Sequence, residues 1–161
     1  MKNLIAIFAV MILIGVSAFA QKSANTSAAA TTTVIRSLSI DKNQDLDFGR
    51  VAQGVTETIS WTSSKAVKFT VLGEDLENVN ITFAAPSVLT HTNGTATLPL
   101  TSYVKQNGSD DAAAAWEIAS GATVGLNATG NYYVYLGGQV SPAASQTRGF
   151  YSGDFTINVE Y

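Results

Sequence analysis

The chain has 161 residues, a formal net charge of −3 and no cysteine. Without cysteine it has no disulfide framework, no thiolate metal site and no cysteine nucleophile, so its stability must come from packing. A weakly acidic chain without a basic cluster is also a poor partner for nucleic acid or for an anionic lipid surface.

The first twenty residues have the pattern of a secretory signal peptide. Lys2 supplies the positive start, residues 4–16 form an apolar run too short to span a bilayer, and residues 18–20 form a small-x-small cleavage pattern. We therefore expect residues 1–20 to be removed and the mature chain to begin at Gln21. No later apolar run approaches the length of a membrane helix, so we expect no membrane span in the mature chain.

Residues 21–33, QKSANTSAAATTT, are small and polar and predict a flexible leader. From Val34 onward, short runs with alternating apolar residues follow one another, as in half-buried strands. About nine such runs are present, at residues 34–40, 46–52, 55–61, 66–73, 78–83, 95–104, 122–126, 132–138 and 153–161.

The connections between these runs carry turn signals. Asn93-Gly94 and Asn107-Gly108 tolerate the positive φ angles that tight hairpins require. Pro99 cannot donate a ladder hydrogen bond, so we expect its strand to lie at a sheet edge. Many short strands with polar turns predict an all-β sandwich or barrel.

Residues 109–119, SDDAAAAWEIA, permit two interpretations. Acidic residues ahead of four alanines are typical of a helix N-terminus, and the stretch is long enough for a short surface helix. The same residues are compatible with a strand that ends at Gly121, and the sequence leaves the choice open.

The stretch DKNQDLDFG suggests a calcium loop, because oxygen-bearing residues fall at alternate positions. The four candidates are Asp41, Asn43, Asp45 and Asp47. The positions at which such a loop needs glycine and a bidentate glutamate hold Leu46 and Ala52. We therefore favour a polar turn between two strands and expect no metal ion.

Catalytic chemistry has few candidate residues. His91 is the single histidine and precedes a probable hairpin turn, where we expect it to be solvated. Glu74, Asp75 and Glu77 cluster in one turn, as is usual in a solvated loop. Because no pattern indicates an activated serine or threonine, we expect neither enzymatic activity nor a cofactor.

The C-terminal stretch GFYSGDFTINVEY, residues 149–161, alternates like a strand with one buried face and one wet face. Its large apolar side chains share one parity: Phe155, Ile157, Val159 and Tyr161. We expect these four side chains to belong to a core. Gly153 permits the kink that starts the strand.

Three short motifs carry a resemblance to a known family. They are Leu46, Asp47, Phe48 and Gly49; a Gly-Gly step at Gly137 and Gly138; and Gly149, Tyr151 and Gly153 of a Gly-x-Tyr-Ser-Gly stretch. With these motifs the chain, from about Thr33 to its end, resembles secreted bacterial proteins catalogued as domain of unknown function 4402. None of these residues is chemically reactive, so the resemblance implies a scaffold.

The family in turn looks similar to the β-sandwich subunits of bacterial pili built by donor-strand exchange. This implies an immunoglobulin-like or pilin-like antiparallel β-sandwich of about seven to nine strands over residues 34–161. In that assembly mode an incomplete sandwich leaves a groove that the tail of the next subunit fills by strand addition. The tail here is residues 21–33, whose Ala, Ser and Thr side chains fill pockets poorly.

The resemblance leads us to expect a non-enzymatic structural or adhesive fimbrial subunit, located in the periplasm, on the surface or outside a Gram-negative bacterium. Its partners would be other copies or a periplasmic assembly factor, through strand addition. Two alternatives remain: a small outer-membrane β-barrel, which ends on a similar strand, and a glycan-binding module. The glycan hypothesis rests on Tyr133 and Tyr135, which share a face of one predicted strand, with Tyr132 on the other.

Overall fold

The computed structural model describes residues 24–161, so the expected signal peptide and residues 21–23 of the leader lie outside the described residues. Residues 24–33 have no regular secondary structure. Val34–Tyr161 forms one compact unit. Over the described residues, no helix is long and apolar enough to cross a membrane.

The compact unit is built from strands, and no helix occurs in residues 24–161. The eleven strands are β1 (Ser39–Lys42), β2 (Glu57–Ile59), β3 (Val67–Leu72), β4 (Asn78–Ala84), β5 (Val88–His91), β6 (Thr97–Asn107), β7 (Trp116–Glu117), β8 (Ala122–Gly125), β9 (Asn131–Val140), β10 (Tyr151–Ser152) and β11 (Thr156–Glu160).

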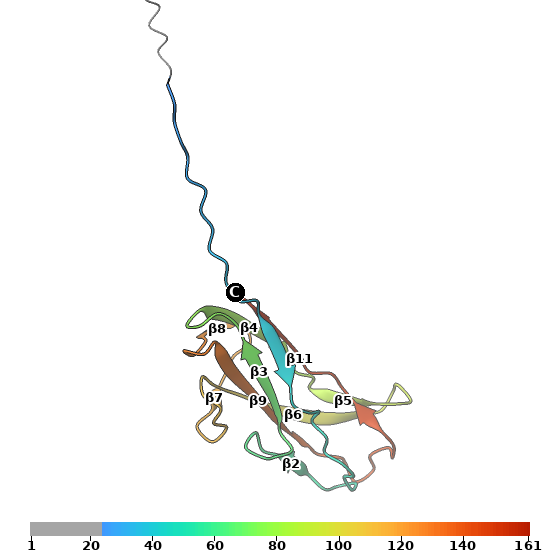
Figure 1. The fold of residues 1–161 in the computed structure, drawn as a ribbon. Helices are drawn as coiled ribbons and strands as arrows, with labels where there is room; N and C mark the ends of the chain where they lie inside the picture. Colours follow the sequence, from blue (N-terminus) through green and yellow to red (C-terminus); the bar gives the residue numbers. More distant parts are fainter. Residues whose placement is uncertain (1–23) are drawn as a thin grey trace, which may run out of the picture. The chain divides into compact units, whose positions relative to one another are not determined.

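The strands pair into two antiparallel sheets of unequal size (Figure 1). The large sheet has eight strands in the order β1-β3-β9-β6-β5-β10, with β2 paired to β9 and β7 paired to β6. The small sheet has three strands in the order β11-β4-β8. Within the described residues β11 and β8 each pair only with β4, β1 pairs only with β3 and β10 only with β5, so both sheets have open edges. The expected antiparallel β-sandwich is confirmed.

The core lies between the inner faces of the two sheets. In β3 the side chains alternate between buried and half-buried, as the apolar alternation of Val67, Phe69 and Val71 predicts. The register pairs Phe69 with Val134 and Val67 with Leu136 of β9, which places these side chains on one face. The buried cluster is Val67, Phe69, Val71, Val79, Ile81, Val104, Ile118, Val124, Leu126, Tyr132, Val134 and Leu136.

The structure decides between the two interpretations of residues 109–119. They form a turn followed by the two-residue strand β7, and no helix. The carboxylate of Asp111 accepts hydrogen bonds from the amides of Ala113 and Ala114, at 2.9 and 3.2 Å. A capping contact therefore forms, but the chain pairs Trp116 with Gln106 of β6 instead of continuing into a helix.

The strand count is higher than the seven to nine expected, because β5, β7 and β10 are short pairings that alternation alone does not reveal. The strand expected at residues 46–52 does not form. Leu46 and Phe48 are nevertheless both half-buried, with exposed residues between and after them. The stretch therefore keeps the predicted alternation without pairing to a neighbour.

Pro99 lies on β6, which is an inner strand of the large sheet and not an edge strand. Its pairing partner is Val88 of β5, whereas the pairing of β6 with β9 begins at Leu100. The strand therefore has only one neighbour at Pro99, so the missing N–H costs no ladder hydrogen bond on the other side.

The two neighbouring glycines of β9 face opposite sides of the sheet. A Cβ on Gly137 would lie 2.4 Å from the carbonyl oxygen of Ile59, so β2 and the backbone of Trp61 occupy the space of that side chain. A Cβ on Gly138 would lie 3.2 Å from the ring of Phe48. The Gly-Gly step thus admits backbone on one face of the sheet and an aromatic ring on the other.

Gly137→Ala is expected to destabilise the protein by about 1–3 kcal/mol, because backbone atoms cannot move aside as a side chain can. The matched control is Gly108→Ala, whose Cβ would meet its nearest atom, on Tyr132, at an ordinary 3.8 Å. Urea unfolding of both variants measures the difference. Equal stability of the two variants would contradict the close approach of β2 to Gly137.

Candidate functional site

An open groove of about 780 Å³ reaches the inner face of the large sheet. We use the name "open groove" for the cavity lined by β3, β5, β6 and β9 together with residues 45–49 and 148–155. Its buried apolar lining residues are Val67, Phe69, Leu98, Leu136 and Val140. The groove therefore leads from the surface directly to core side chains.

The groove exists because the two sheets differ in size. Neither β4 nor β8 contributes a lining residue among those that the structure describes. The small sheet thus covers one part of the large sheet, and loop segments surround the rest. Phe150, which also lines the groove, is 69% exposed, as expected of an apolar residue without a partner to cover it.

Two motifs that are about a hundred positions apart in the sequence meet at this groove. The lining includes Leu46, Asp47, Phe48, Gly49, Gly149, Tyr151, Gly153 and Phe155. Gly138 lies directly beneath Phe48, as described above. The first and last of the three motifs that carried the family resemblance therefore meet at one surface feature, and Gly137 faces the other side of the sheet.

Phe155 joins the groove to the core of the sandwich. Its ring stacks between Phe69 of β3 and Phe83 of β4, at centroid distances of 5.6 and 5.8 Å. Phe155 packs half-buried against the core cluster, as do Ile157 and Val159 on β11. These three positions agree with the inward parity expected from the sequence.

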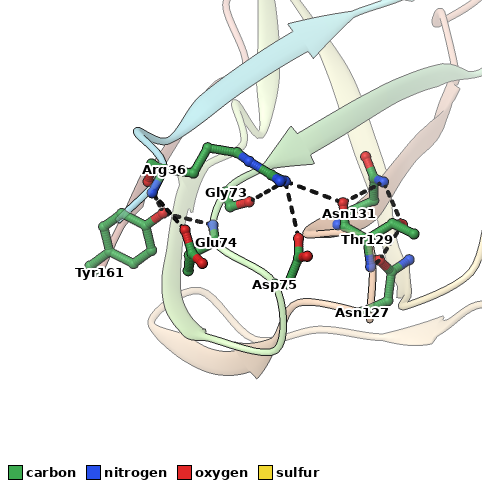
Figure 2. Close-up of polar contacts among 8 residues, drawn as sticks. All are labelled: Arg36, Gly73, Glu74, Asp75, Asn127, Thr129, Asn131 and Tyr161. Carbon is green, nitrogen blue, oxygen red and sulfur yellow. Dashed lines mark hydrogen bonds and ion pairs between the residues drawn. The ribbon is translucent and has the colours of Figure 1, made fainter. Parts of the chain in front are cut away.

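Tyr161 departs from that parity, because its side chain remains 48% exposed. Its hydroxyl donates a hydrogen bond to the carbonyl of Arg36 and accepts one from the amide of Glu74, at 2.9 Å in the latter case (Figure 2). Tyr161 thus acts as a polar link between chain segments and not as a core residue. The phenol group allows this role, since it is apolar along the ring and polar at its tip.

His91 lies directly before a turn, as expected from the sequence, but its ring is half-buried and hydrogen-bonded instead of being free in solvent. It ends β5, and its ring packs edge-on against Tyr151 at a centroid distance of 4.9 Å. Its Nδ1 accepts the amide N–H of Asn93 at 3.0 Å, so the proton sits on Nε2, which donates to the carbonyl of Arg148 at 3.0 Å. His91 therefore holds the loop beside the groove, which no local sequence signal indicates.

Gly149 is required by this arrangement. Its φ is +145°, and a Cβ at this position would lie 2.0 Å from Nε2 of His91. Any side chain here would displace the imidazole and the loop that it holds. Gly49 has a φ of +69°, a conformation that favours glycine. It lies in a tight turn, in which its amide donates a hydrogen bond to the carboxylate of Asp47 at 2.7 Å.

The edge of the small sheet lies next to the open groove. β11 follows Phe155 directly, and over residues 24–161 its single pairing partner is β4. One side of β11 therefore presents unpaired backbone groups. Such an edge is a template for the addition of another strand.

The four calcium candidates lie in a polar segment, where three of them make other contacts. Among the described residues no group of three or more His, Cys, Asp or Glu is placed to hold an ion. Asn43 instead accepts the amide of Lys68 at 2.6 Å, Asp45 pairs with Lys42, and Asp47 closes the turn at Gly49. Asp41 lies on β1 opposite Thr70.

The tyrosines of β9 do not form an exposed platform. Tyr132 is buried in the core, and its hydroxyl donates to the side chain of Gln106 at 2.8 Å. Tyr135 is also buried, on the outer face, and its hydroxyl donates to Asp110 at 3.0 Å. Only Tyr133 retains partial exposure, with the ammonium of Lys68 5.9 Å from its ring centre. The glycan-binding alternative required Tyr133 and Tyr135 to be exposed together, and the burial of Tyr135 removes this support.

Asp110 and Tyr135 perturb one another's titration. The hydrogen bond from Lys68, at 2.8 Å, and the one from Tyr135 lower the pKa of the Asp110 carboxyl, against a smaller opposing effect of burial. Burial, followed by the hydrogen bond to Asp110 and its charge, raises the pKa of Tyr135 far above its usual value of 10.0. Burial also raises the pKa of Tyr132.

These features define the chain as an antiparallel β-sandwich of two unequal sheets, with an open groove that has an apolar floor and an edge strand, β11, that pairs on one side only among the described residues. The family described as "Domain of unknown function (DUF4402)" matches residues 53–161, and the protein belongs to this family. The Leu46–Gly49 motif lies before the matched range. No protein of curated function matches the chain.

Among solved structures, the chain is similar to a chain of the crystal structure of the CsuC-CsuE chaperone-tip adhesion subunit pre-assembly complex from archaic chaperone-usher Csu pili of Acinetobacter baumannii. The two are 19% identical, with a TM-score of 0.41. The match covers 80% of this chain and 40% of that chain, so this chain spans less than half the length of its neighbour.

Phe155→Ala is expected to lower the free energy of unfolding by about 2–3 kcal/mol, somewhat below the ~3–5 kcal/mol of a fully buried phenylalanine. The loss reflects the two stacking contacts that join the sheets. Phe150→Ala is the matched control and is expected to stay within about 0.5 kcal/mol of the parent protein. Similar effects of the two substitutions in urea unfolding would show that Phe155 does not join the sheets.

Alkaline unfolding tests the raised pKa of Tyr135. The folded protein binds the phenolic proton more tightly than the unfolded chain, so the stabilisation is complete below the unfolded pKa of about 10 and stability falls as pH rises above it. Tyr135→Phe is expected to flatten this fall, as measured by urea unfolding between about pH 8 and 11. An unchanged steepness above about pH 10 would contradict the assignment.

Proposed function

We propose that the protein is an exported, non-enzymatic structural subunit of a bacterial surface fibre, which joins its neighbours by accepting a strand at β11 and the open groove. The observation that carries this proposal is the meeting of two sequence motifs at an apolar groove beside an unpaired edge strand. Residues 1–20 would be the signal peptide, residues 21–33 the donor segment, and residues 34–161 the acceptor domain.

The groove and the edge supply the two requirements of strand addition. Unpaired backbone groups on β11 provide main-chain hydrogen bonds, which give affinity, and the groove receives alternate side chains, which give specificity. Burying exposed apolar residues such as Phe150 adds to the driving force. An unpaired strand edge also favours aggregation. We therefore propose that an assembly factor in the periplasm binds β11 and the open groove and keeps them covered until a donor strand is added.

The donor segment favours extended structure more than its small side chains suggest. Residues 31–33 are three consecutive threonines, which are β-branched and fit a pleated strand well. Main-chain hydrogen bonds do not depend on side-chain size, so a strand of Ala and Thr can still pair with β11. The small side chains would limit the depth to which the strand enters the groove, and hence its affinity.

A role without catalysis is supported by the contacts of the single histidine. Both ring nitrogens of His91 are engaged in hydrogen bonds with backbone groups, so neither is free to accept a proton from a substrate. An adhesive role would require a receptor-binding surface in addition to the groove. We propose the structural role and treat adhesion as a separate property of the fibre.

Cysteine cross-linking tests strand addition directly, since the chain contains no cysteine of its own. One cysteine replaces Asn158, which is exposed on β11, and the second replaces Ala28, Ala29 or Ala30 in turn, which scans the register of the leader. Oxidation of the mature protein is expected to give a ladder of disulfide-linked multimers on a non-reducing gel for at least one position.

Two controls sharpen the result. Moving the edge cysteine from Asn158 to Lys65, an exposed turn residue before β3, is expected to abolish the ladder. Deletion of residues 21–33 is expected to leave monomers in size-exclusion chromatography and no fibres in electron microscopy. A cross-linked monomer would show that the leader folds onto its own edge, and fibres formed without the leader would overturn the proposal.

A further inference from the structure

Arg36 is held by groups from three separate parts of the fold (Figure 2). Its guanidinium Nη1 donates to the carbonyl of Gly73 at 3.0 Å, to the carboxylate of Asp75 at 3.1 Å and to the carbonyl of Thr129 at 3.5 Å. Its backbone amide donates to the carboxylate of Glu74 at 2.6 Å. One residue therefore contacts both the β3–β4 turn and the β8–β9 turn.

Tyr161 closes this arrangement from the other end of the domain. Its hydroxyl lies between the carbonyl of Arg36, to which it donates, and the amide of Glu74, from which it accepts. We call the set Arg36, Gly73, Glu74, Asp75, Thr129 and Tyr161 the Arg36 clamp. Figure 2 shows the guanidinium and the phenol hydroxyl reaching the same turn from opposite sides.

Two glycines make room for the clamp. A Cβ on Gly130 would lie 2.7 Å from Nη1 of Arg36 and 2.2 Å from the carbonyl oxygen of Gly73. A Cβ on Gly73 would lie 3.0 Å from the hydroxyl of Tyr161. The space that the guanidinium and the phenol occupy exists only because both positions lack side chains.

The clamp and the open groove lie at opposite ends of β1 and β11. β1 begins three residues after Arg36 and ends at Lys42, which lines the groove. β11 runs in the opposite sense, from the groove residue Phe155 toward Tyr161. A force applied to the chain before Val34 therefore reaches the domain first at the clamp. A force applied by a partner bound in the groove acts at the opposite ends of β1 and β11.

We infer that the Arg36 clamp is a tension-bearing anchor, which keeps β1 seated when the leader is pulled away from the groove. The inference rests on the proposed function only for the origin of the pull, because a donor segment held by a neighbour would apply it. The clamp itself is a property of the single domain. Arg36 and Tyr161 are its positioning residues.

The physical need for such an anchor follows from the pairing of β1. β1 is an edge strand of four residues, and within residues 24–161 it pairs only with β3. Val34 is 91% exposed and Ile35 46%, so Arg36 is the first residue after the leader with hydrogen bonds that can resist a pull. With the clamp in place, the load passes through Arg36 into two turns and the C-terminal segment before it reaches the ladder of β1.

Arginine suits this role better than lysine. All three side-chain contacts come from Nη1, which the planar guanidinium holds in a fixed direction. A lysine ammonium is a compact charge on a flexible stem and is not fixed in this way. The charged pair with Asp75 is half exposed on both sides, so its own contribution in water is small. The anchor depends on several hydrogen bonds that must break together, and not on one strong ion pair.

Single-molecule force spectroscopy on the monomeric protein tests the anchor without requiring a fibre. Handles are attached to two introduced cysteines, Thr26→Cys in the leader and Ser152→Cys beside the groove. Arg36→Ala and Tyr161→Phe are each expected to shift the unfolding force to lower values, and Arg36→Lys to give an intermediate shift. Arg50→Ala is the control, since no hydrogen bond or ion pair of the Arg50 side chain is found within residues 24–161.

A second pair of handles separates an anchor from general stability. With Asp41→Cys in place of Thr26→Cys, the pull enters on β1 beyond Arg36, and the same clamp variants are expected to leave the unfolding force unchanged. Equal shifts with both handle pairs, or no shift with the leader handle, would overturn the inference. Circular dichroism confirms that each variant is folded, and Tyr161→Phe keeps the ring in place if Arg36→Ala does not fold.

The two proposals can fail independently. If the mature protein forms no fibres but the clamp variants lower the unfolding force measured with the leader handle, the anchor is supported and strand addition is contradicted. If fibres form and the clamp variants leave the leader-handle force unchanged, strand addition stands and the anchor falls.

Discussion

The structure depends on one mismatch: an eight-stranded sheet with an apolar inner face is covered by a sheet of three strands. Burial of apolar area is the main favourable term in folding, and a chain without disulfides has no covalent support for an incomplete core. The uncovered part is therefore filled chiefly by residues 45–49 and by residues 148–155, which include the two-residue strand β10. They narrow the opening and do not close it.

Two glycines of the chain are explained by this partial filling. Gly138 leaves space for the ring of Phe48, and Gly149 leaves space for the imidazole of His91. Both rings belong to the segments that surround the groove. A family signature made of glycines and aromatics thus describes how loops pack over a sheet, which is why its residues carry no reactive group.

The sequence predicted the parts of the fold that depend on local alternation. β2, β3, β8 and β11 fall within the expected runs, and β4 and β9 extend beyond theirs by one or two residues at an end. The inward parity of Phe155, Ile157 and Val159 is also seen. The failures have a common cause, which is contact between distant segments. Tyr161 is drawn out of the core by Arg36 and Glu74, and His91 is held by Arg148 and Asn93.

The groove illustrates the same limit. Its existence depends on how far the small sheet extends over the large one, and alternation within a strand does not contain that information. The sequence did identify the two motifs, because glycine and aromatic residues in short fixed patterns are visible locally. Their meeting place required the register of β5, β6 and β9.

The contact between Tyr161 and Arg36 spans 125 positions of the chain. Folds dominated by contacts between distant positions form slowly, because the entropy of closing the loop is lost before the contact energy is gained. Because the chain is synthesised from its N-terminus, Arg36 emerges long before its partner. The domain thus spends a period without its final strand, with the ring of Phe69 not yet covered by Phe155.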